Sequence, residues 1–315
     1  MARSLRVAAA QLGPTGRRDA RSVVVDRLCQ LMEGAARDRV DLVVFPELAL
    51  TSFFPRWLLP QGPDLDAFYE QAAPEQFLVQ LLELARGSRM GFSIGFAEKT
   101  IDANRTRHFN TTVLYDQSAA LVGKYRKIHL PGDRVEMPGT KFQHLEKRYF
   151  ETGDLGFTAW RAFGGVVGML ICNDRRWPEA WRVLGLQGVE LVLVGFNTPL
   201  HNPEAPEHDR LVGFHHALVM QAGCYQNATW AVAAGKAGIE EGQAMLADSM
   251  IVAPSGEIVA RSTTSADELV VADIDLDRTR SYKTTIFDFG AHREPDAYRM
   301  IVERKAGRAP GEMTR

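Results

Sequence analysis

The 315-residue chain is 45% hydrophobic and 24% charged, and 37 Lys and Arg against 39 Asp and Glu give it a formal net charge of -2. That apolar content is ordinary for a globular protein, and the balanced charge gives no electrostatic reason to expect binding of nucleic acid or of an anionic membrane surface. No run approaches the ~20 apolar residues of a membrane helix, and three cysteines cannot build a disulfide framework. We therefore expect a cytoplasmic protein with reduced thiols.

Predicted strands recur along the whole chain as short runs rich in Val, Leu, Ile and Ala, the pattern of strands covered on both faces. The first is Leu5–Leu12. Arg3 and Arg6 precede its apolar stretch Val7–Ala10, but that stretch is shorter than the roughly 7–15 residues that a signal sequence needs, and Gln11 interrupts it. The others are Asp41–Phe45, Phe92–Ala97, Thr111–Tyr115, Val166–Ile171, Glu190–Phe196, Thr229–Ala233, Ser249–Ala253 and Leu269–Ile274. The Pro-Ser-Gly stretch within Ala253–Val259 predicts a hairpin turn.

Helical spacing of apolar residues lies between these strands. Arg21–Arg37 has this spacing, with Asp19 as a possible N-terminal cap. Similar patterns occupy Gln76–Ala85, Glu179–Leu186 and His208–Gln226. Alternating strands and helices predict an α/β layered protein. Because no linker or internal repeat divides the chain, we expect one domain over residues 1–304 and a polar C-terminal tail over 305–315.

Three chemically distinct side chains lie in segments that each look like the end of a strand. Cys172 ends the predicted strand Val166–Ile171, and charged residues come directly after it. Glu47 follows the strand Asp41–Phe45. Lys127 lies in the segment Gly123–Pro131, which has a similar pattern. A carboxylate, an ammonium group and a thiol at the mouth of a sheet are the groups that acyl transfer from an amide requires.

Hydrolysis of an amide or a urea is slow because donation of the nitrogen lone pair stabilises the carbonyl group. It needs a strong nucleophile, a base and a positive group where the oxyanion forms. A free thiol has a pKa of ~8.5, so only a small part of it is thiolate at neutral pH. We therefore expect Glu47 to accept the proton of Cys172 and to return it to the leaving nitrogen. Lys127 and the backbone N–H of Asn173 are expected to stabilise the oxyanion.

The segments around these residues resemble those of the nitrilase superfamily of carbon–nitrogen hydrolases, and within it those of N-carbamoyl-D-amino-acid amidohydrolases. One short motif would be weak evidence, but the similar segments follow one another in the same order over most of residues 5–295. They are Phe45–Leu50, Phe53–Trp57, Lys124–Gly132, Phe142–Phe150, Cys172–Pro178, Asn197–Pro199, Phe214–His216, Met220–Gly223 and Ile251–Pro254.

The resemblance implies a four-layer α-β-β-α sandwich that forms a homo-oligomer, a dimer of dimers, and that uses neither a metal nor an organic cofactor. It implies that Glu47 is the base, Lys127 the oxyanion stabiliser and Cys172 the nucleophile. It adds Glu146 as a second catalytic carboxylate beside the reacting amide. The implied reaction converts a small N-carbamoyl-D-amino acid to the D-amino acid, carbon dioxide and ammonia through a covalent intermediate on the cysteine.

Two arginines indicate what kind of substrate is bound. Arg175 and Arg176 follow the predicted nucleophile by three and four residues. Guanidinium groups bind carboxylates bidentately, so this pair predicts an acidic substrate. Asn197 and Thr198 follow the strand Glu190–Phe196, at the strand end where α/β sheets usually bind ligands. The resemblance implies that substrate is held by Asn173, Asn197 and Thr198 and that the pocket is supported by His129, His144 and His215.

Other functions remain open at this stage. Another carbon–nitrogen hydrolase, such as an amidase or a β-ureidopropionase-like enzyme, would use the same catalytic groups. An inert scaffold of the superfamily would usually lack one of them, whereas this chain has all three. A metal enzyme is disfavoured because the chain has no His-Glu-x-x-His motif and no closely spaced Cys/His pattern. Cys29 and Cys224 lie in predicted helices, and we interpret them as core residues.

Overall fold

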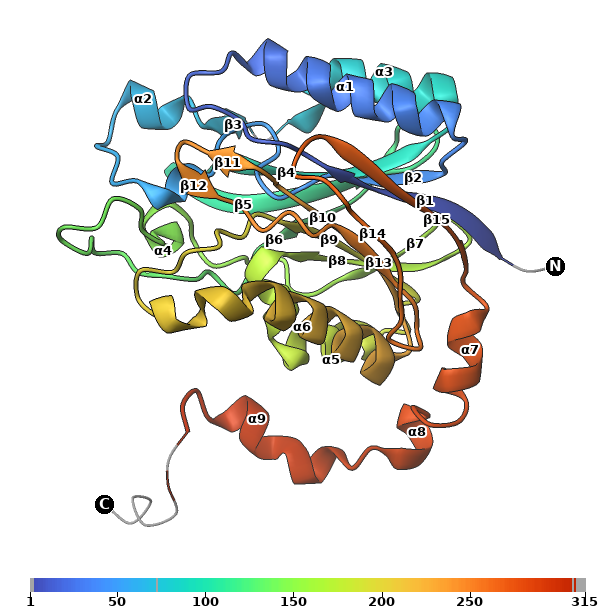
Figure 1. The fold of residues 1–315 in the computed structure, drawn as a ribbon. Coiled ribbons are helices and arrows are strands. Elements are labelled where there is room, and N and C mark those ends of the chain that lie inside the picture. The colour runs from blue at the N-terminus through green and yellow to red at the C-terminus, as the bar shows by residue number, and fades with distance from the viewer. Residues whose placement is uncertain (1–2, 72, 308, 310–315) are drawn as a thin grey trace.

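The computed structural model describes residues 3–71, 73–307 and 309, and it contains two stacked β-sheets between two layers of helices (Figure 1). Helices α1 and α3 cover the outer face of the first sheet, and α5 and α6 cover the outer face of the second (Figure 1). The predicted four-layer α-β-β-α fold is therefore confirmed.

The first sheet has the strand order β15-β1-β2-β4-β5-β6, with β3 paired to β4. Its strands are β1 (Ser4–Gln11), β2 (Leu42–Val44), β3 (Tyr69–Gln71), β4 (Gly91–Asp102), β5 (Arg105–Tyr115), β6 (Leu121–Arg126) and β15 (Glu268–Asp275). The neighbours β1, β2 and β4 are parallel, whereas β15, β5 and β6 pair antiparallel with their neighbours. The parallel centre sends the carboxyl ends of β1, β2 and β4 to one edge of the sheet.

The second sheet has the order β14-β13-β10-β9-β8-β7, again with a parallel centre of β8, β9 and β10. Its strands are β7 (Ala159–Ala162), β8 (Gly165–Ile171), β9 (Leu191–Phe196), β10 (Trp230–Gly235), β13 (Met250–Val252) and β14 (Ile258–Arg261). A short separate hairpin is formed by β11 (Ile239–Glu240) and β12 (Gln243–Ala244). The turn expected within Ala253–Val259 joins β13 to β14, and that prediction is confirmed.

The α-helices are α1 (Arg21–Arg37), α2 (Pro63–Asp66), α3 (Val79–Ser88), α4 (Glu146–Tyr149), α5 (Pro178–Leu186), α6 (Val212–Asn227), α7 (Arg278–Lys283), α8 (Phe289–His292) and α9 (Arg299–Glu303). Three details of the helix predictions are wrong. Helix α3 begins at Val79 and not at Gln76, which ends the separate 3-10 turn Pro74–Gln76. Ala20 occupies the N-cap of α1, and the carboxylate of Asp19 instead accepts a bond from the backbone N–H of Gly16. The helix expected from His208 starts as the 3-10 turn Pro206–Leu211 and becomes α-helical only at Val212.

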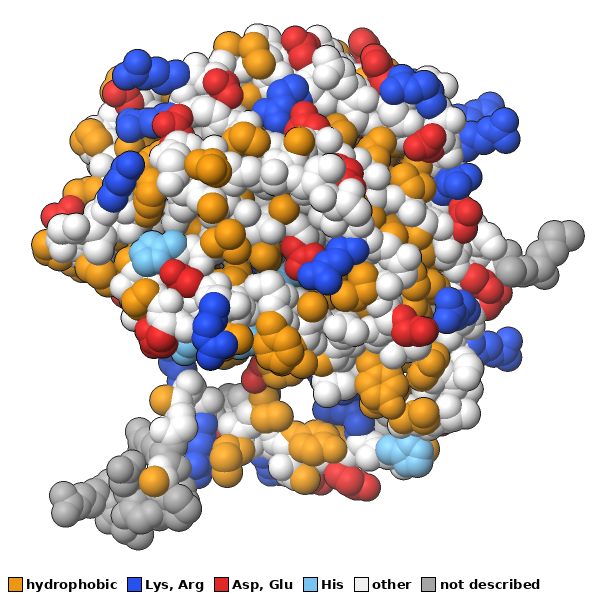
Figure 2. All heavy atoms as spheres, viewed as in Figure 1, with side chains coloured by type: hydrophobic (Ala, Val, Ile, Leu, Met, Phe, Trp, Pro, Cys, Tyr) orange, Lys and Arg blue, Asp and Glu red, His pale blue; other side chains and the backbone are white. Residues whose placement is uncertain are grey.

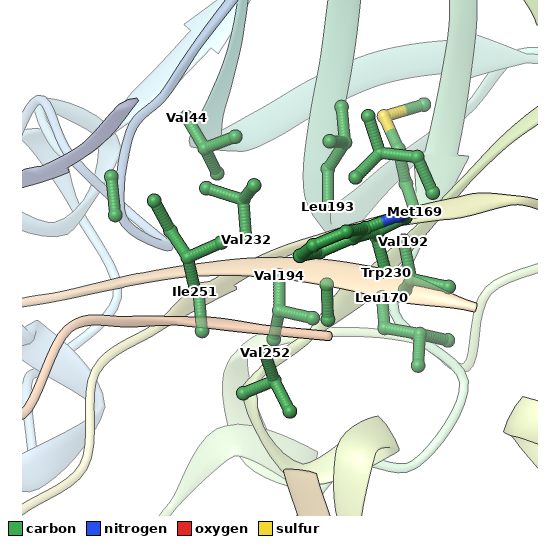
Figure 3. Packing of buried hydrophobic residues seen from close by; sticks show 14 of the residues in the cluster. Val44, Met169, Leu170, Val192, Leu193, Val194, Trp230, Val232, Ile251 and Val252 are labelled. Carbon is green, nitrogen blue, oxygen red and sulfur yellow. The ribbon is translucent and has the colours of Figure 1, made fainter. Parts of the chain in front are cut away.

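Alternation of side chains explains why the strand sequences are apolar throughout. In β1, Val7 and Ala9 face the second sheet, whereas Ala8 and Ala10 face α1 and α3. Figure 3 shows Val44 of β2 pointing toward Val232 of β10 across the space between the sheets. Both faces of the central strands are thus buried, so period-two alternation of polar and apolar residues is absent.

The end of the described chain differs from the body. Residues 278–307, here named the C-terminal arm, leave the sheets and run past α5 and α6 (Figure 1). Phe287 packs edge-on against Tyr225 of α6 at 4.9 Å, and Arg182 of α5 lies 4.3 Å above the ring of Phe289. Most of the predicted tail, residues 308 and 310–315, lies outside the described residues, so the domain boundary at 304 stays a prediction. Within the described residues, no helix is both long and apolar enough to cross a membrane.

Candidate active site

Glu47 lies in the loop after β2, which is clamped between the two sheets. The backbone N–H groups of Phe45 and Ala49 donate to carbonyl groups of β4, at 2.9 and 2.8 Å. A Cβ atom at Gly95 would lie 2.7 Å from the Cα of Glu47, and one at Gly195 would lie 2.8 Å from the nitrogen of Glu47. Glycine at both positions therefore lets β4 and β9 approach one peptide from opposite sides, which sets the position of the carboxylate.

Lys127 follows β6 and is wholly buried between two carboxylates. Its Nζ atom donates to Oε1 of Glu47 at 2.6 Å and to Oε2 of Glu146 at 2.7 Å. The amide of Asn110, on β5, donates to the same oxygen of Glu47 at 2.7 Å. The other oxygen of Glu47, Oε2, is buried and has no hydrogen-bond partner among the described residues. That oxygen therefore has a free lone pair, whereas Oε1 is already engaged by two donors.

The charges of this cluster depend on one another. Burial acts against the ammonium form of Lys127, but Glu146 and Glu47 together raise its pKa above the ordinary value, so the group stays positively charged. Burial raises the pKa of Glu146 to about 7; Lys127 opposes this change and Glu47 adds to it. Glu146 can therefore gain or lose a proton near neutral pH.

Cys172 lies where β8 turns into the 3-10 turn Cys172–Arg176. Its φ angle is +47°, a left-handed conformation that is uncommon for a residue with a side chain and that recurs at functional sites. The Sγ atom lies 3.8 Å from both the carbonyl oxygen of Asn197 and the hydroxyl of Thr198. Burial raises the pKa of the thiol, and Glu47 raises it further, whereas Lys127 and Arg175 lower it.

The predicted catalytic residues converge on one pocket of about 390 Å³, a size that suits a small molecule. Cys172 and Glu146 line this pocket, and Lys127 and Glu47 lie directly behind Glu146. The lining residues are Phe53, Pro131, Gly132, His144, Glu146, Cys172, Asn173, Arg176, Asn197, Thr198, Pro199, Asn202, Glu204, His208, Asp209, Val212, His215, Leu218 and Val219. Four side chains from two loops, one 3-10 turn and one short helix thus meet at one place, although their roles stay a prediction.

Most of the predicted substrate residues also line the pocket: they are Asn173, Arg176, Asn197, Thr198, His144 and His215. Both polar atoms of the Asn197 amide are buried and lack a hydrogen-bond partner among the described residues. Nε2 of His144 is also buried and has no hydrogen-bond partner among the described residues. Burial lowers the pKa of this histidine to about 4, and the positive charge of Arg176 adds to the effect. A neutral imidazole and a free amide facing the pocket can both hydrogen-bond to a polar ligand.

Two predicted residues do not line the pocket. The Nδ1–H group of His129 donates to the carboxylate of Asp174 at 2.9 Å, and the ring stacks on Trp177 with 5.0 Å between the ring centroids. Arg175 is fully buried beneath the nucleophile, so only Arg176 of the arginine pair faces the ligand space. A direct contact of His129 or Arg175 with substrate stays a prediction.

The sequence analysis overlooked Asn110, Asp174 and His216. Asn110 orients Glu47 and stands one residue before the predicted strand Thr111–Tyr115, as the polar residue after buried Phe109. Asp174 is buried and accepts bonds from Tyr125 at 2.8 Å and from the backbone of Ile171 at 3.1 Å. A carboxylate two residues after a candidate nucleophile was the available signal.

Within the described chain, no group of three or more His, Cys, Asp or Glu residues could hold a metal ion.

Comparison with known proteins extends over nearly the whole chain. A family profile for carbon–nitrogen hydrolase matches residues 6–284. An N-carbamoylputrescine amidase from Oryza sativa subsp. japonica is 28% identical over 313 residues, which cover 94% of both chains. A second one, from Arabidopsis thaliana, is 30% identical over 247 residues, which cover 75% of this chain and 77% of the relative.

The fold is similar to that of solved structures as well. The crystal structure of a carbon–nitrogen hydrolase from Helicobacter pylori G27 aligns with a TM-score of 0.82 at 23% identity, and the alignment covers 96% of this chain and 100% of that one. The structural similarity confirms the fold, and the family profile confirms the resemblance to the superfamily of carbon–nitrogen hydrolases. The two curated relatives act, by their names, on N-carbamoylputrescine, so the narrower likeness to N-carbamoyl-D-amino-acid amidohydrolases stays a prediction from the sequence segments.

Proposed function

Since the chain belongs to the carbon–nitrogen hydrolase family, we propose that it hydrolyses a linear ureido compound that also carries a carboxylate, with N-carbamoyl-D-amino acids as the first candidates. The observation that carries this proposal is Arg176, which lines the pocket beside Cys172 and has no ion-pair partner among the described residues. A cation left free in a ligand pocket suits an anionic substrate group. The preference for the D-enantiomer rests on the sequence resemblance.

The proposed reaction starts at Cys172. Its thiol proton passes to the free Oε2 of Glu47 while the sulfur bonds to the ureido carbon and the π electrons of the carbonyl group move to its oxygen. The ammonium group of Lys127 stabilises the oxyanion. The oxyanion then re-forms the carbonyl, one carbon–nitrogen bond breaks, and Glu47 returns the proton to the leaving nitrogen. Water attacks the remaining thioester-like carbon and gives a proton to Glu47. The carbon–sulfur bond then breaks, and the proton on Glu47 returns to the sulfur of Cys172. The carbamic acid that is released breaks down to carbon dioxide and an amine or ammonia.

Glu146 supports the same step from the pocket wall. Its carboxylate shares the Lys127 ammonium with Glu47 and faces the ligand space. While ionised, it can accept a hydrogen bond from an amide N–H of the substrate and so orient the scissile bond. Its raised pKa, about 7, also allows it to stay protonated beside Glu47 when no substrate is bound.

Arg176→Gln tests the assignment of the carboxylate. Hydrogen bonds to a charged group contribute about 1.5–3 kcal/mol, so kcat/KM for N-carbamoyl-D-amino acids is expected to fall about 10–100-fold. The loss should appear mainly in KM, because the carboxylate does not change during the reaction. Ammonia release is measured with N-carbamoyl-D- and L-amino acids, N-carbamoyl-β-alanine, N-carbamoylputrescine and simple amides.

The matched control is Arg161→Gln, an exposed arginine on β7 that lies away from the pocket. It should leave every kinetic constant unchanged.

A second candidate substrate class, cationic N-carbamoyl amines such as N-carbamoylputrescine, is favoured by the named relatives. If the wild-type enzyme prefers N-carbamoylputrescine and Arg176→Gln improves that activity, the carboxylate proposal is wrong and the second candidate replaces it.

We also propose a homo-oligomer that uses the layer of α5 and α6. Figure 2 shows hydrophobic side chains gathered over α6 and on the C-terminal arm. The large exposed apolar residues at the start of α5, in α5, in α6 and in the arm are Trp177, Val183, Leu186, Phe214, Leu218, Tyr225, Ile286, Tyr298, Met300, Ile301 and Val302. A second copy that covers this face would bury them, and a two-fold arrangement would bring the arm of each chain onto its partner. A dimer of dimers would need a further interface.

Deleting the residues after Arg293 is expected to reduce the molecular mass measured by light scattering, because it removes the apolar end of the arm but leaves Phe287 and Phe289 in place. Phe214→Glu, on the exposed face of α6, should also reduce the molecular mass measured by light scattering. Ile101→Glu is the control and should leave the mass unchanged, because Ile101 is even more exposed than Phe214 but lies in the β4–β5 hairpin. A wild-type chain that is monomeric at the concentrations of the assay contradicts the proposal.

A further inference from the structure

Arg175 is a buried cation that the proposed reaction has not used. Only 1% of its surface is exposed, and it lies one turn of the 3-10 helix beyond Cys172. Its Nη1 atom donates to the carbonyl oxygen of Cys172 at 2.6 Å and lies 3.7 Å from Sγ of the same residue. Its Nη2 atom donates to the hydroxyl of Thr198 at 3.0 Å, and this hydroxyl also contacts the sulfur. One guanidinium group therefore contacts the nucleophile both directly and through a neighbour.

The partners of Arg175 include no carboxylate among the described residues. They are a carbonyl group, a thiol, a hydroxyl and an imidazole. Arg56, which is buried to the same extent, is paired with the carboxylate of Glu240 at 2.6 Å. A buried cation without a counter-ion is costly. The group nearest to Arg175 that can become negative is the thiol of Cys172, and burial, which lowers the pKa of Arg175, is opposed first by that thiol.

His216 holds the guanidinium in place. Nδ1 of His216 accepts a hydrogen bond from Nε of Arg175 at 2.9 Å. Its other nitrogen lies 3.2 Å from the carbonyl oxygen of Asp248, which can only accept, so Nε2 carries the proton. Burial and the neighbouring Arg175 lower the pKa of His216 well below its ordinary value. The imidazole is therefore neutral and cannot supply a competing charge.

We propose that Arg175 is a positioning residue for the nucleophile, and that its guanidinium group holds the Cys172 sulfur and stabilises the thiolate formed when the proton passes to Glu47. His216 orients that guanidinium. The proposal rests on the proposed function in taking Cys172 as the nucleophile. The two adjacent arginines thus have different proposed roles. Arg176 binds the substrate, whereas Arg175 acts on the reaction by holding the sulfur of Cys172.

The charges that act on Cys172 lie on several elements. Lys127 and Arg175 favour the thiolate, and Glu47 and Glu146 oppose it. Burial and the carboxylates outweigh the two cations and raise the pKa of the thiol, so the thiol is protonated at neutral pH. Removing the charge of Arg175 leaves Lys127 as the cation that favours the thiolate, and Lys127 is already shared by two carboxylates. The thiolate should therefore form at higher pH.

The test is the pH dependence of alkylation of Cys172 by iodoacetamide, followed by mass spectrometry of the peptide that contains it. A nearby opposite charge usually shifts such an ionisation by 1–3 pH units, so Arg175→Gln is expected to raise the midpoint by about 1–3 pH units. Arg175→Lys keeps the charge and should give a smaller rise. Arg176→Gln is the adjacent control and should leave the midpoint unchanged. In turnover assays, Arg175→Gln should lower kcat for charged and uncharged substrates alike.

An unchanged midpoint in folded Arg175→Gln protein overturns the proposal. Equal shifts in Arg175→Gln and Arg176→Gln also overturn it, because the effect would then be a general loss of positive charge. A rise in KM confined to substrates with a carboxylate, without a change of the midpoint, would identify Arg175 as a substrate ligand instead. If Arg175→Gln does not fold, His216→Leu decides the question: a raised midpoint supports the proposal, and an unchanged one refutes it. Alkylation needs no substrate. The test of Arg175 therefore stays valid even if the protein does not hydrolyse N-carbamoyl-D-amino acids.

Discussion

Replacing Cys172 by alanine is expected to lower turnover by about 10⁴-fold or more, the scale seen when the nucleophile of a covalent mechanism is removed. The pocket loses only a sulfur atom, and its polar walls remain in place. Substrate should therefore still bind. Ammonia release measures the chemistry, and calorimetric titration with substrate measures the binding. Intact-protein mass spectrometry of the wild-type enzyme during turnover should show an adduct that the variant lacks.

The matched control is Cys224→Ala, which removes another buried thiol. Cys224 lies in α6 and packs in the core rather than in the pocket. That variant should lose stability through a small cavity but keep turnover per folded molecule. Near-normal turnover by Cys172→Ala would contradict the proposed mechanism, and loss of turnover in both variants would point to unfolding as the cause.

Replacing Lys127 by methionine is expected to abolish turnover and to destabilise the fold by about 3–5 kcal/mol, the cost of leaving buried charges without a partner. The substitution keeps the volume of the side chain but leaves Glu47 and Glu146 side by side. Both carboxylates are buried, so one of them must take up a proton. The free energy of unfolding is measured by chemical denaturation.

The loss of stability should depend on pH. The pKa of Glu146 is raised by burial to about 7 in the wild-type fold, and Lys127 keeps it from rising further. A carboxyl whose pKa is raised on folding stabilises fully at pH values below its unfolded pKa, and this contribution is lost as the pH rises through the folded pKa. Without Lys127 the folded pKa rises above about 7. The variant should then be much closer to wild-type stability at pH 5 than at pH 8.

Two further variants separate the charge from the chemistry. Adding Glu146→Gln to Lys127→Met should recover stability at pH 8, because one buried carboxylate is gone, but it should not restore turnover. Lys236→Met is the matched control, since Lys236 is buried and pairs with Glu240 outside the pocket. It should destabilise the fold while keeping turnover per folded molecule. A Lys127→Met variant of wild-type stability at every pH would show that the buried carboxylates do not need the ammonium group.

The central strands and longer helices could be predicted because their patterns are local. Runs such as Val166–Ile171 are apolar throughout, and the structure confirms them as strands that are covered on both sides. Weaker patterns were overlooked: β6 and β7 carry charged and half-buried residues, and the helices of the C-terminal arm are short and exposed. Periodicity carries little information where neither face is buried.

The sequence by itself determined the chemical parts of this protein: a thiol and a carboxylate that follow apolar runs, and an ammonium group after a more polar segment, all in segments similar to one superfamily. The tertiary structure decided which groups meet. Gly95 and Gly195 let both sheets press on the peptide of Glu47, and Asn110 on β5 aims its carboxylate. Arg175 and Arg176 are neighbours in the chain, yet the 3-10 turn sends one beneath the sulfur and the other into the pocket. Direction and burial of a side chain depend on contacts between residues far apart in sequence, and no local pattern records them.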